Sequence, residues 1–144
     1  MKHYSLLLLR ISIGLLFVIW GLDKLVNVQH AVNVSNAFFL GIFSAPVLLN
    51  IYGVIEILIG VLVVLGWFRR FTYPVVILIS LVTTLGVWKS IIDPWGWIFE
   101  GTNALFYPSL ITLFASVVIY AFRHEDIKAL DNGARRRTDN LSGN

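Results

Sequence analysis

Two ionisable side chains interrupt segments of the sequence that are otherwise apolar, and these two are the best placed to do chemistry. Arg10 lies in the apolar run 5–22, and Glu56 lies in the run 47–68. A guanidinium in hydrocarbon costs at least ~2.5 kcal/mol, so Arg10 needs an internal partner or water. An arginine beside a carboxylate offers hydrogen-bond donors together with a proton acceptor. We therefore predict that Arg10 and Glu56 form a buried polar pair.

Small residues accompany both charges at helical spacing. Each charge shares its helix face with two glycines: Gly14 and Gly21 beside Arg10, and Gly53 and Gly60 beside Glu56. Glycines let neighbouring backbones approach closely in a membrane, so both faces should pack on protein. If the two helices run antiparallel, the axial gap between the charges is roughly 8 Å, which two long side chains can close. The two side chains are expected to meet directly or through water.

Other polar residues end the apolar runs or lie in the connection between the last two runs. They are Asp23, Lys24, Lys89, Asp93, Glu100 and Asn103. We expect one rim of the molecule to gather them into a polar mouth on its outer side. Such a ring is either a set of ion pairs that fasten helix ends, or the entrance to a site whose floor is the Arg10–Glu56 pair.

Three aromatic residues lie near this rim, namely Trp95, Trp97 and Tyr107. Tryptophan and tyrosine are enriched at the level of lipid head groups, where an amphipathic ring suits the interface. The same rings can stack on a flat ligand. The sequence leaves both interpretations open.

Several classes of cofactor are excluded by residue type. The chain contains no cysteine, which removes disulfides, thiolate metal sites and iron–sulfur clusters. The histidines His3, His30 and His124 all fall outside the apolar runs, so we do not expect paired ligation of a haem within the membrane. We predict no metal site and no intrinsic cofactor.

The composition identifies the elements that hold these residues as membrane helices. Hydrophobic residues make up 58% of the 144 residues, and charged residues only 13%. Four apolar runs of ~18 to 22 residues are each long enough to cross a hydrocarbon core. They predict helices at 5–22, 47–68, 71–92 and 104–122. The expected fold class is all-α, an integral membrane four-helix bundle in a single domain, 1–122.

The distribution of basic residues predicts the topology. Most of them flank the N-terminus, the connection between the second and third helices, and the segment after the fourth. The positive-inside rule therefore puts both termini in the cytoplasm. Residues 123–144, which include Arg135, Arg136 and Arg137, are expected to be a basic, mobile cytoplasmic tail. A basic segment just after a membrane helix favours contact with anionic lipid over nucleic acid.

The longest connection, residues 23–46, is predicted on the outer side. It contains Phe38, Phe39 and Phe43 and is too apolar for a solvated loop. We expect it to lie in the membrane interface or to pack back on the bundle.

A set of residues spread along the chain forms a wider pattern. It comprises Leu9, Arg10, Gly14, Phe17, 21–25, Phe39, Gly41, Pro46, Gly53, Glu56, Ile57, Gly60, Gly66, Arg69 and 103–107. With these residues the chain resembles the DoxX family of small four-helix membrane proteins over nearly all of 6–123. The resemblance implies a multi-pass protein of the bacterial inner membrane. It also implies links to quinone-coupled oxidation of sulfur compounds, to membrane oxidoreductase complexes and to tolerance of thiol stress, while more distant relatives act as assembly factors.

The residues and the resemblance together leave three functions open. In the first, the chain is a non-haem subunit of a quinone-linked membrane redox complex, in which the Arg10–Glu56 site and an apolar slot hold a bound quinone or a partner subunit. In the second, it is a non-catalytic assembly or structural subunit whose pair fixes helix register. In the third, an oligomer forms a small proton-coupled transporter.

The expected partners differ little among the three functions. They are membrane lipids, other membrane or periplasmic oxidoreductase subunits, and further copies of the chain in a homo-oligomer, with no nucleic acid. Any enzymatic role is expected to be that of an oxidoreductase subunit without its own redox centre.

Overall fold

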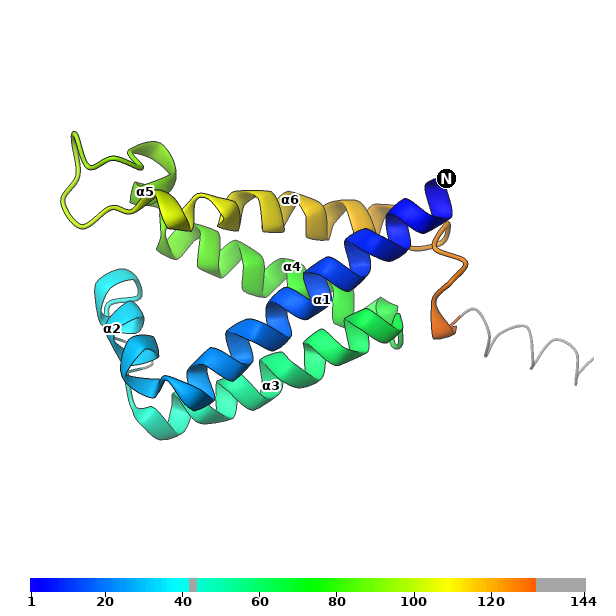
Figure 1. The fold of residues 1–144 in the computed structure, drawn as a ribbon, viewed down its shortest axis with the longest axis horizontal. Helices are drawn as coiled ribbons and strands as arrows, with labels where there is room; N and C mark the ends of the chain where they lie inside the picture. The colour runs from blue at the N-terminus through cyan, green and yellow to red at the C-terminus, as the bar shows by residue number, and fades with distance from the viewer. Residues whose placement is uncertain (42–43, 132–144) are drawn as a thin grey trace, which may run out of the picture.

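The computed structural model describes residues 1–41 and 44–131, and all regular secondary structure in this part of the chain is helical (Figure 1). In chain order the elements are α1 (Lys2–Val26), α2 (Val28–Phe38), α3 (Pro46–Leu65), α4 (Arg69–Gly86), α5 (Trp88–Ile92), the 3₁₀ turn η1 (Ala104–Phe106) and α6 (Pro108–Ala121). The long helices are α1, α3, α4 and α6. This agrees with the predicted fold class at the level of an all-helical protein.

The helices α1 and α3 form an antiparallel pair whose backbones touch at the predicted glycines. A Cβ atom added to Gly14 would lie 2.7 Å from the carbonyl oxygen of Gly60, and one added to Gly21 would lie 2.5 Å from that of Gly53. Real side chains do not tolerate such distances, so only glycine permits this approach. The contacts also fix the register, because Gly14 lies level with Gly60 and Gly21 lies level with Gly53.

The helices α4 and α6 form a second antiparallel pair. Near the end of α4, the hydroxyl of Thr84 donates to the carbonyl oxygen of Ser109 at 3.1 Å, and near its start the guanidinium of Arg69 donates to the carbonyl oxygen of Arg123. The two pairs converge at the end of the molecule that holds the N-terminus, and they diverge at the other end, where α2 lies (Figure 1). We call these the N-terminal end and the α2 end. A buried apolar core fills the converging half: Ile13, Phe17, Val63, Tyr73, Val76 and Ile119.

The helix boundaries differ from the predicted ones in two places. The run 47–68 is interrupted at Gly66 and Phe68, which adopt φ values of +67° and +53°, so α3 ends there and α4 begins. The run 71–92 is divided at Val87 into α4 and α5.

Three segments within the described residues are long and apolar enough to cross a membrane: Lys2–Val26, Pro46–Leu65 and Ala104–Ala121. The helix α4 is 18 residues long, but Arg69 and Arg70 occupy its first turn. The chain therefore has the character of a membrane protein. The fourth crossing and the cytoplasmic position of both termini stay predictions.

Residues 123–131, after α6, are held by polar contacts with the helices, contrary to the mobile tail that their composition predicts. The carboxylate of Asp131 accepts hydrogen bonds from the backbone N–H groups of Phe68 at 3.0 Å and Arg69 at 2.9 Å. The prediction for 123–144 is wrong for 123–131, because polar side chains there bind helix ends and buried charges instead of water. Residues 132–144, with their arginine run, lie outside the described residues.

Candidate functional site

The two predicted site charges are buried, but they do not meet. Arg10 is 2% exposed and Glu56 is 1% exposed. Nη1 of Arg10 lies 2.9 Å from Oδ2 of Asp126, whereas Oε2 of Glu56 lies 2.7 Å from Nζ of Lys24. The predicted Arg10–Glu56 pair is therefore wrong, and two separate ion pairs stand in its place.

The direction of side chains along a helix explains this exchange of partners. Every Cα–Cβ bond tilts toward the N-terminus of its own helix. Because α1 and α3 are antiparallel, Lys24 and Glu56 lean toward each other from either side of the Gly21–Gly53 contact. Arg10 and Glu56 lie about 12 Å apart along the axis and lean away from each other. Arg10 therefore reaches toward the N-terminal end, where Asp126 lies.

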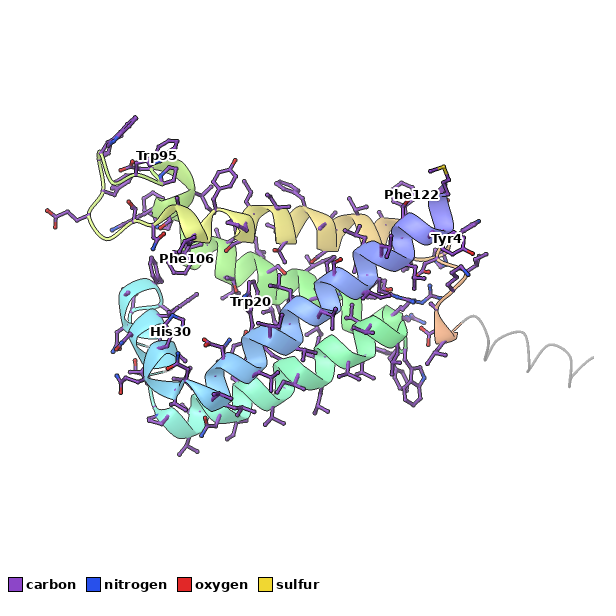
Figure 2. All side chains as sticks on the ribbon, viewed as in Figure 1. Tyr4, Trp20, His30, Trp95, Phe106 and Phe122 are labelled. Carbon is purple, nitrogen blue, oxygen red and sulfur yellow. The ribbon has the colours of Figure 1, made fainter. Side chains whose placement is uncertain are left out.

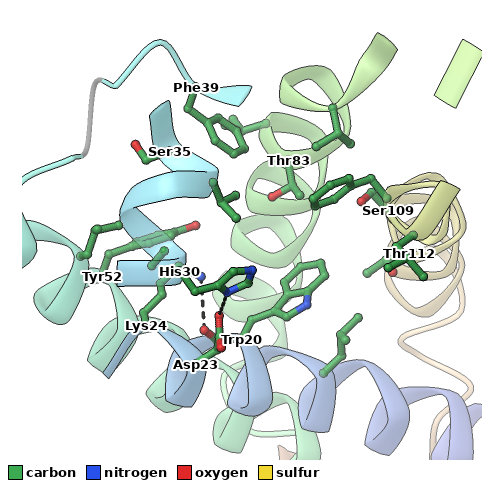
Figure 3. Close-up of a pocket in the computed structure, with 18 of the residues that line it drawn as sticks. Trp20, Asp23, Lys24, His30, Ser35, Phe39, Tyr52, Thr83, Ser109 and Thr112 are labelled. Carbon is green, nitrogen blue, oxygen red and sulfur yellow. Dashed lines mark hydrogen bonds and ion pairs between the residues drawn. The ribbon is translucent and has the colours of Figure 1, made fainter. Parts of the chain in front are cut away.

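A cleft of about 440 Å³ lies between the two helix pairs at the α2 end (Figure 3). Its walls are mostly apolar and include the aromatic side chains of Trp20, Phe39, Tyr52 and Phe106. Figure 2 shows Trp20 and Phe106 on opposite sides of the space between the helix pairs. The volume falls in the range of small-molecule sites, which are typically apolar with a few polar groups.

One polar wall of this cleft is formed by Lys24. Its side chain is 19% exposed, whereas the side chain of its partner Glu56 is 2% exposed. Nζ of Lys24 also donates to the carbonyl oxygen of Trp20 at 3.3 Å and lies 5.2 Å from the centroid of the Tyr52 ring. The cleft therefore presents a hydrogen-bond donor that is backed by a buried carboxylate.

A second polar contact lies where the cleft meets the surface. Oδ2 of Asp23 lies 2.8 Å from Nδ1 of His30, and the two side chains are 40% and 56% exposed. The contact ties the end of α1 to α2. An exposed imidazole and an exposed carboxylate therefore lie between the cleft and the aqueous phase.

The helix α2 is held over the cleft by aromatic contacts with the second helix pair. The ring centroids of Phe38 and Phe106 are 4.5 Å apart. Phe39 packs on Gly86, where an added Cβ atom would lie 2.3 Å from a carbon of the ring. The connection 23–46 thus packs back on the bundle, which is one of the two placements predicted for it.

Asp93 does not line the cleft, because its carboxylate organises the loop between α5 and η1. The carboxylate accepts hydrogen bonds from the backbone N–H groups of Phe99 at 2.9 Å, Ile98 at 2.6 Å and Trp97 at 3.0 Å. These donors favour the ionised form and hold the pKa of Asp93 below its usual range, and the N–H group of Phe99 has the largest effect.

The polar mouth that the sequence predicts is dispersed in the structure. Lys89 lies 5.9 Å from the centroid of an aromatic ring of the same loop, Asn103 caps η1, and Glu100 is exposed. Asp23 and Lys24 are the predicted mouth residues that line the cleft. The others lie on α5 and on the loop that follows it, where Lys89, Asp93 and Asn103 have local ring or backbone partners.

The predicted stacking residues also lie away from the cleft. Trp95 and Trp97 stack on each other at 5.4 Å and are 70% and 83% exposed. Tyr107 is 44% exposed. The aromatic side chains that line the cleft are instead Trp20, Phe39, Tyr52 and Phe106.

Asp93→Asn is expected to loosen the α5–η1 loop, because an amide offers one acceptor oxygen where the carboxylate offers two. The N–H donors lower the pKa of Asp93 in the folded state. The stability that these hydrogen bonds give to the folded loop is therefore complete above the unfolded pKa of ~3.9, and it is lost as the pH falls through the lower folded pKa. The order of the loop can be followed by near-UV circular dichroism, to which the stacked rings of Trp95 and Trp97 contribute.

In the wild type the signal should persist from neutral pH to about pH 4 and fall below it. In Asp93→Asn it should be weak throughout. Glu100→Gln, a change at an exposed residue of the same loop, is the control and should behave as the wild type. A wild-type midpoint above the ordinary range of an aspartate would contradict the assignment.

The sequence model of the DoxX family matches residues 5–89, more than half of the chain. The chain belongs to the DoxX family. No curated protein and no solved structure matches it. The matched range holds both members of the Lys24–Glu56 pair, whereas Asp126 lies beyond it.

Three residues of this DoxX-family protein were not predicted from the sequence: Trp20 and Tyr52, which line the cleft, and Asp126, which pairs with Arg10. Trp20 and Tyr52 each lie four residues before a charged residue, Lys24 and Glu56 respectively, and so share its helix face. That spacing was visible in the sequence. Asp126 gave no signal, because it follows the last apolar run in a polar segment.

No group of three or more histidine, cysteine, aspartate or glutamate side chains is arranged to hold a metal ion among the residues that the structure describes.

Proposed function

We propose that this DoxX-family protein is a non-haem subunit of a quinone-linked membrane redox complex, and that its cleft binds the quinone head group. The observation that carries this proposal is the Lys24–Glu56 pair in the wall of an apolar cleft of about 440 Å³. A quinone head group is a flat ring with two carbonyl oxygens. It therefore needs aromatic faces, a hydrogen-bond donor and a nearby proton-exchanging group.

The residues of the cleft fit these requirements. An ammonium has three N–H donors. Nζ of Lys24 uses two of them on Glu56 and on the carbonyl oxygen of Trp20, which leaves one for a ligand carbonyl. Glu56 balances the charge of Lys24 and holds it in place. Trp20 and Tyr52 supply rings on which a flat ligand can stack.

A bound quinone would supply two-electron, two-proton redox chemistry at this position. The Asp23–His30 contact lies where the cleft meets the surface, between the proposed quinone and the aqueous phase. Lys24 places a proton donor in the cleft wall, and the carboxylate of Glu56 lies behind it, 2.7 Å from Nζ. The chain has no cysteine for a thiolate redox centre, and the proposal assigns the electron source to a partner subunit.

A non-catalytic assembly or structural role is the second candidate. The observation that favours it is that the Lys24–Glu56 pair joins α1 to α3, since a buried ion pair by itself can fix helix register. Under this role the cleft would hold lipid chains and would not prefer a quinone.

Ala31→Phe is expected to weaken quinone binding about 10-fold or more, because Ala31 is 7% exposed and lines the cleft. The added ring occupies the space that the head group would take. Ala37→Phe is the matched control, because Ala37 is exposed on the same helix.

The binding measurement uses quenching of Trp20 fluorescence by a short-chain quinone. The protein for this assay carries phenylalanine in place of the other tryptophans, which are Trp67, Trp88, Trp95 and Trp97. Equal quenching of the Ala31→Phe and Ala37→Phe proteins would overturn the cleft as the binding site. Lipid extraction from the protein purified in mild detergent is the companion measurement. Bound quinone or a co-purifying oxidoreductase would support the redox role. The absence of both would support the assembly role.

A further inference from the structure

A second cavity, of about 630 Å³, lies at the N-terminal end, between the start of α4 and the residues that follow α6. Its charged lining is mostly basic. The basic residues are Arg69, Arg70, Arg123 and His124, and Asp131 is the carboxylate of this lining within the part of the chain that the structure describes. The cavity is separate from the cleft, which lies at the opposite ends of α4 and α6.

Two of these charged side chains already serve the fold. Asp131 accepts hydrogen bonds from the backbone N–H groups of Phe68 and Arg69, and its Oδ2 lies 3.4 Å from Nε of Arg69. Arg69 also donates to the carbonyl oxygens of Arg123 and Asp126. The carboxylate and one guanidinium of the cavity therefore neutralise each other.

The remaining two arginines have donors to offer. Arg70 is exposed and forms no hydrogen bond or ion pair with any residue that the structure describes. Arg123 donates one hydrogen bond, 2.9 Å long, to the carbonyl oxygen of Tyr120 and lies 4.4 Å from the centroid of the Tyr120 ring. A guanidinium carries five N–H donors, so most of those on Arg123 and all of those on Arg70 are available for an anion.

Exposed aromatic rings border the same cavity. Phe68 and Phe71 line it and are 52% and 68% exposed, and the ring of Trp67 stacks on Phe68 at 4.9 Å. An exposed tryptophan at the end of a membrane helix, as Trp67 is, is typical of the head-group level of a bilayer. A soluble phosphate makes no use of such rings, whereas a lipid has acyl chains that pack on them.

We propose that this cavity binds the phosphate head group of an anionic phospholipid, with Arg70 and Arg123 as the phosphate ligands and Phe68 and Phe71 against the first part of the acyl chains. Basic pockets between membrane helices on the cytoplasmic side are suited to such head groups. The site is independent of quinone binding in the cleft.

The test uses the full chain in detergent, titrated with phosphatidylglycerol or phosphatidylcholine and observed by native mass spectrometry. Arg70→Gln with Arg123→Gln is expected to weaken phosphatidylglycerol binding about 25-fold, at about 5-fold for each arginine. Binding of phosphatidylcholine should be weak and unchanged. Arg70→Gln alone, at an exposed residue, should show the 5-fold step even if the double variant folds poorly.

A matched control separates a built site from general electrostatic attraction. Replacing Arg135, Arg136 and Arg137 by glutamine removes three charges from the same chain, one more than the double variant. It is expected to change phosphatidylglycerol affinity less than the double variant does. An equal or larger loss in the tail variant, or equal affinity of the wild type for the two lipids, would overturn the proposal.

Competition distinguishes a lipid head group from a soluble anion. Inorganic phosphate and glycerol 3-phosphate, each in large excess, should leave phosphatidylglycerol bound if the aromatic border contributes. Complete displacement by either would show that the site takes free phosphate and would overturn the lipid assignment.

Discussion

Arg10→Met and Asp126→Leu, introduced one at a time, are each expected to lower the free energy of unfolding by about 3–5 kcal/mol. The two side chains are 3% and 5% exposed, and Nη1 of Arg10 lies 2.9 Å from Oδ2 of Asp126. Removing Asp126 takes the contacting carboxylate away from the buried guanidinium of Arg10, and removing Arg10 takes this guanidinium away from the buried carboxylate. Removing both leaves apolar groups of similar size, so the double variant should recover most of the lost stability.

The measurement is denaturant unfolding in detergent, analysed as a double-mutant cycle. The Arg10–Asp126 cycle should give a coupling energy of about 2 kcal/mol or more. The Arg10→Met and Glu56→Gln changes should instead be additive within about 0.5 kcal/mol, because these residues have different partners. Strong coupling between Arg10 and Glu56, with none between Arg10 and Asp126, would contradict the structure.

Lys24→Met is expected to reduce both stability and quinone affinity. Glu56, with its side chain 2% exposed, would lose the ammonium 2.7 Å away, at a cost of about 3 kcal/mol in unfolding free energy. The cleft would also lose its charged hydrogen-bond donor. A hydrogen bond from a charged group contributes about 1.5–3 kcal/mol, so quinone binding should weaken about 10-fold to 100-fold.

The double variant Lys24→Met with Glu56→Gln separates the two effects. It contains no buried charge at this position, so its stability should return to within about 1 kcal/mol of the wild type. Its quinone affinity should stay low, because the donor is still missing. A double variant that regains both stability and quinone-linked activity would show that the pair is structural, and the assembly role would then be favoured.

The sequence was informative about which residues are buried, and less so about which residues meet. Burial of Arg10 and Glu56 follows from their position in apolar runs and beside glycines, and both side chains are buried. The wrong pairing arose from comparing axial heights alone. Side chains on antiparallel helices lean in opposite directions, so a residue's reach depends on the direction of its helix as well as on its height.

At the candidate site too, the sequence predicted the position of some residues and not of others. Asp23 and Lys24 were predicted near a mouth because they end an apolar run, and they line the cleft. Asp93 was predicted there for the same reason, yet it binds the amides of its own loop. Local sequence cannot separate these outcomes, because a carboxylate at a helix end satisfies backbone donors or faces a cavity depending on how the next segment folds.

By itself the sequence determined the helical class, the apolar segments and the glycine faces that let α1 and α3 touch, since these depend on composition and on spacing along a single helix. The tertiary structure alone decided that the two helix pairs diverge at the α2 end, that α2 covers the opening, and that Asp126 returns to Arg10. Those features depend on contacts between residues far apart in the chain, and no local pattern encodes the angle at which two helix pairs cross.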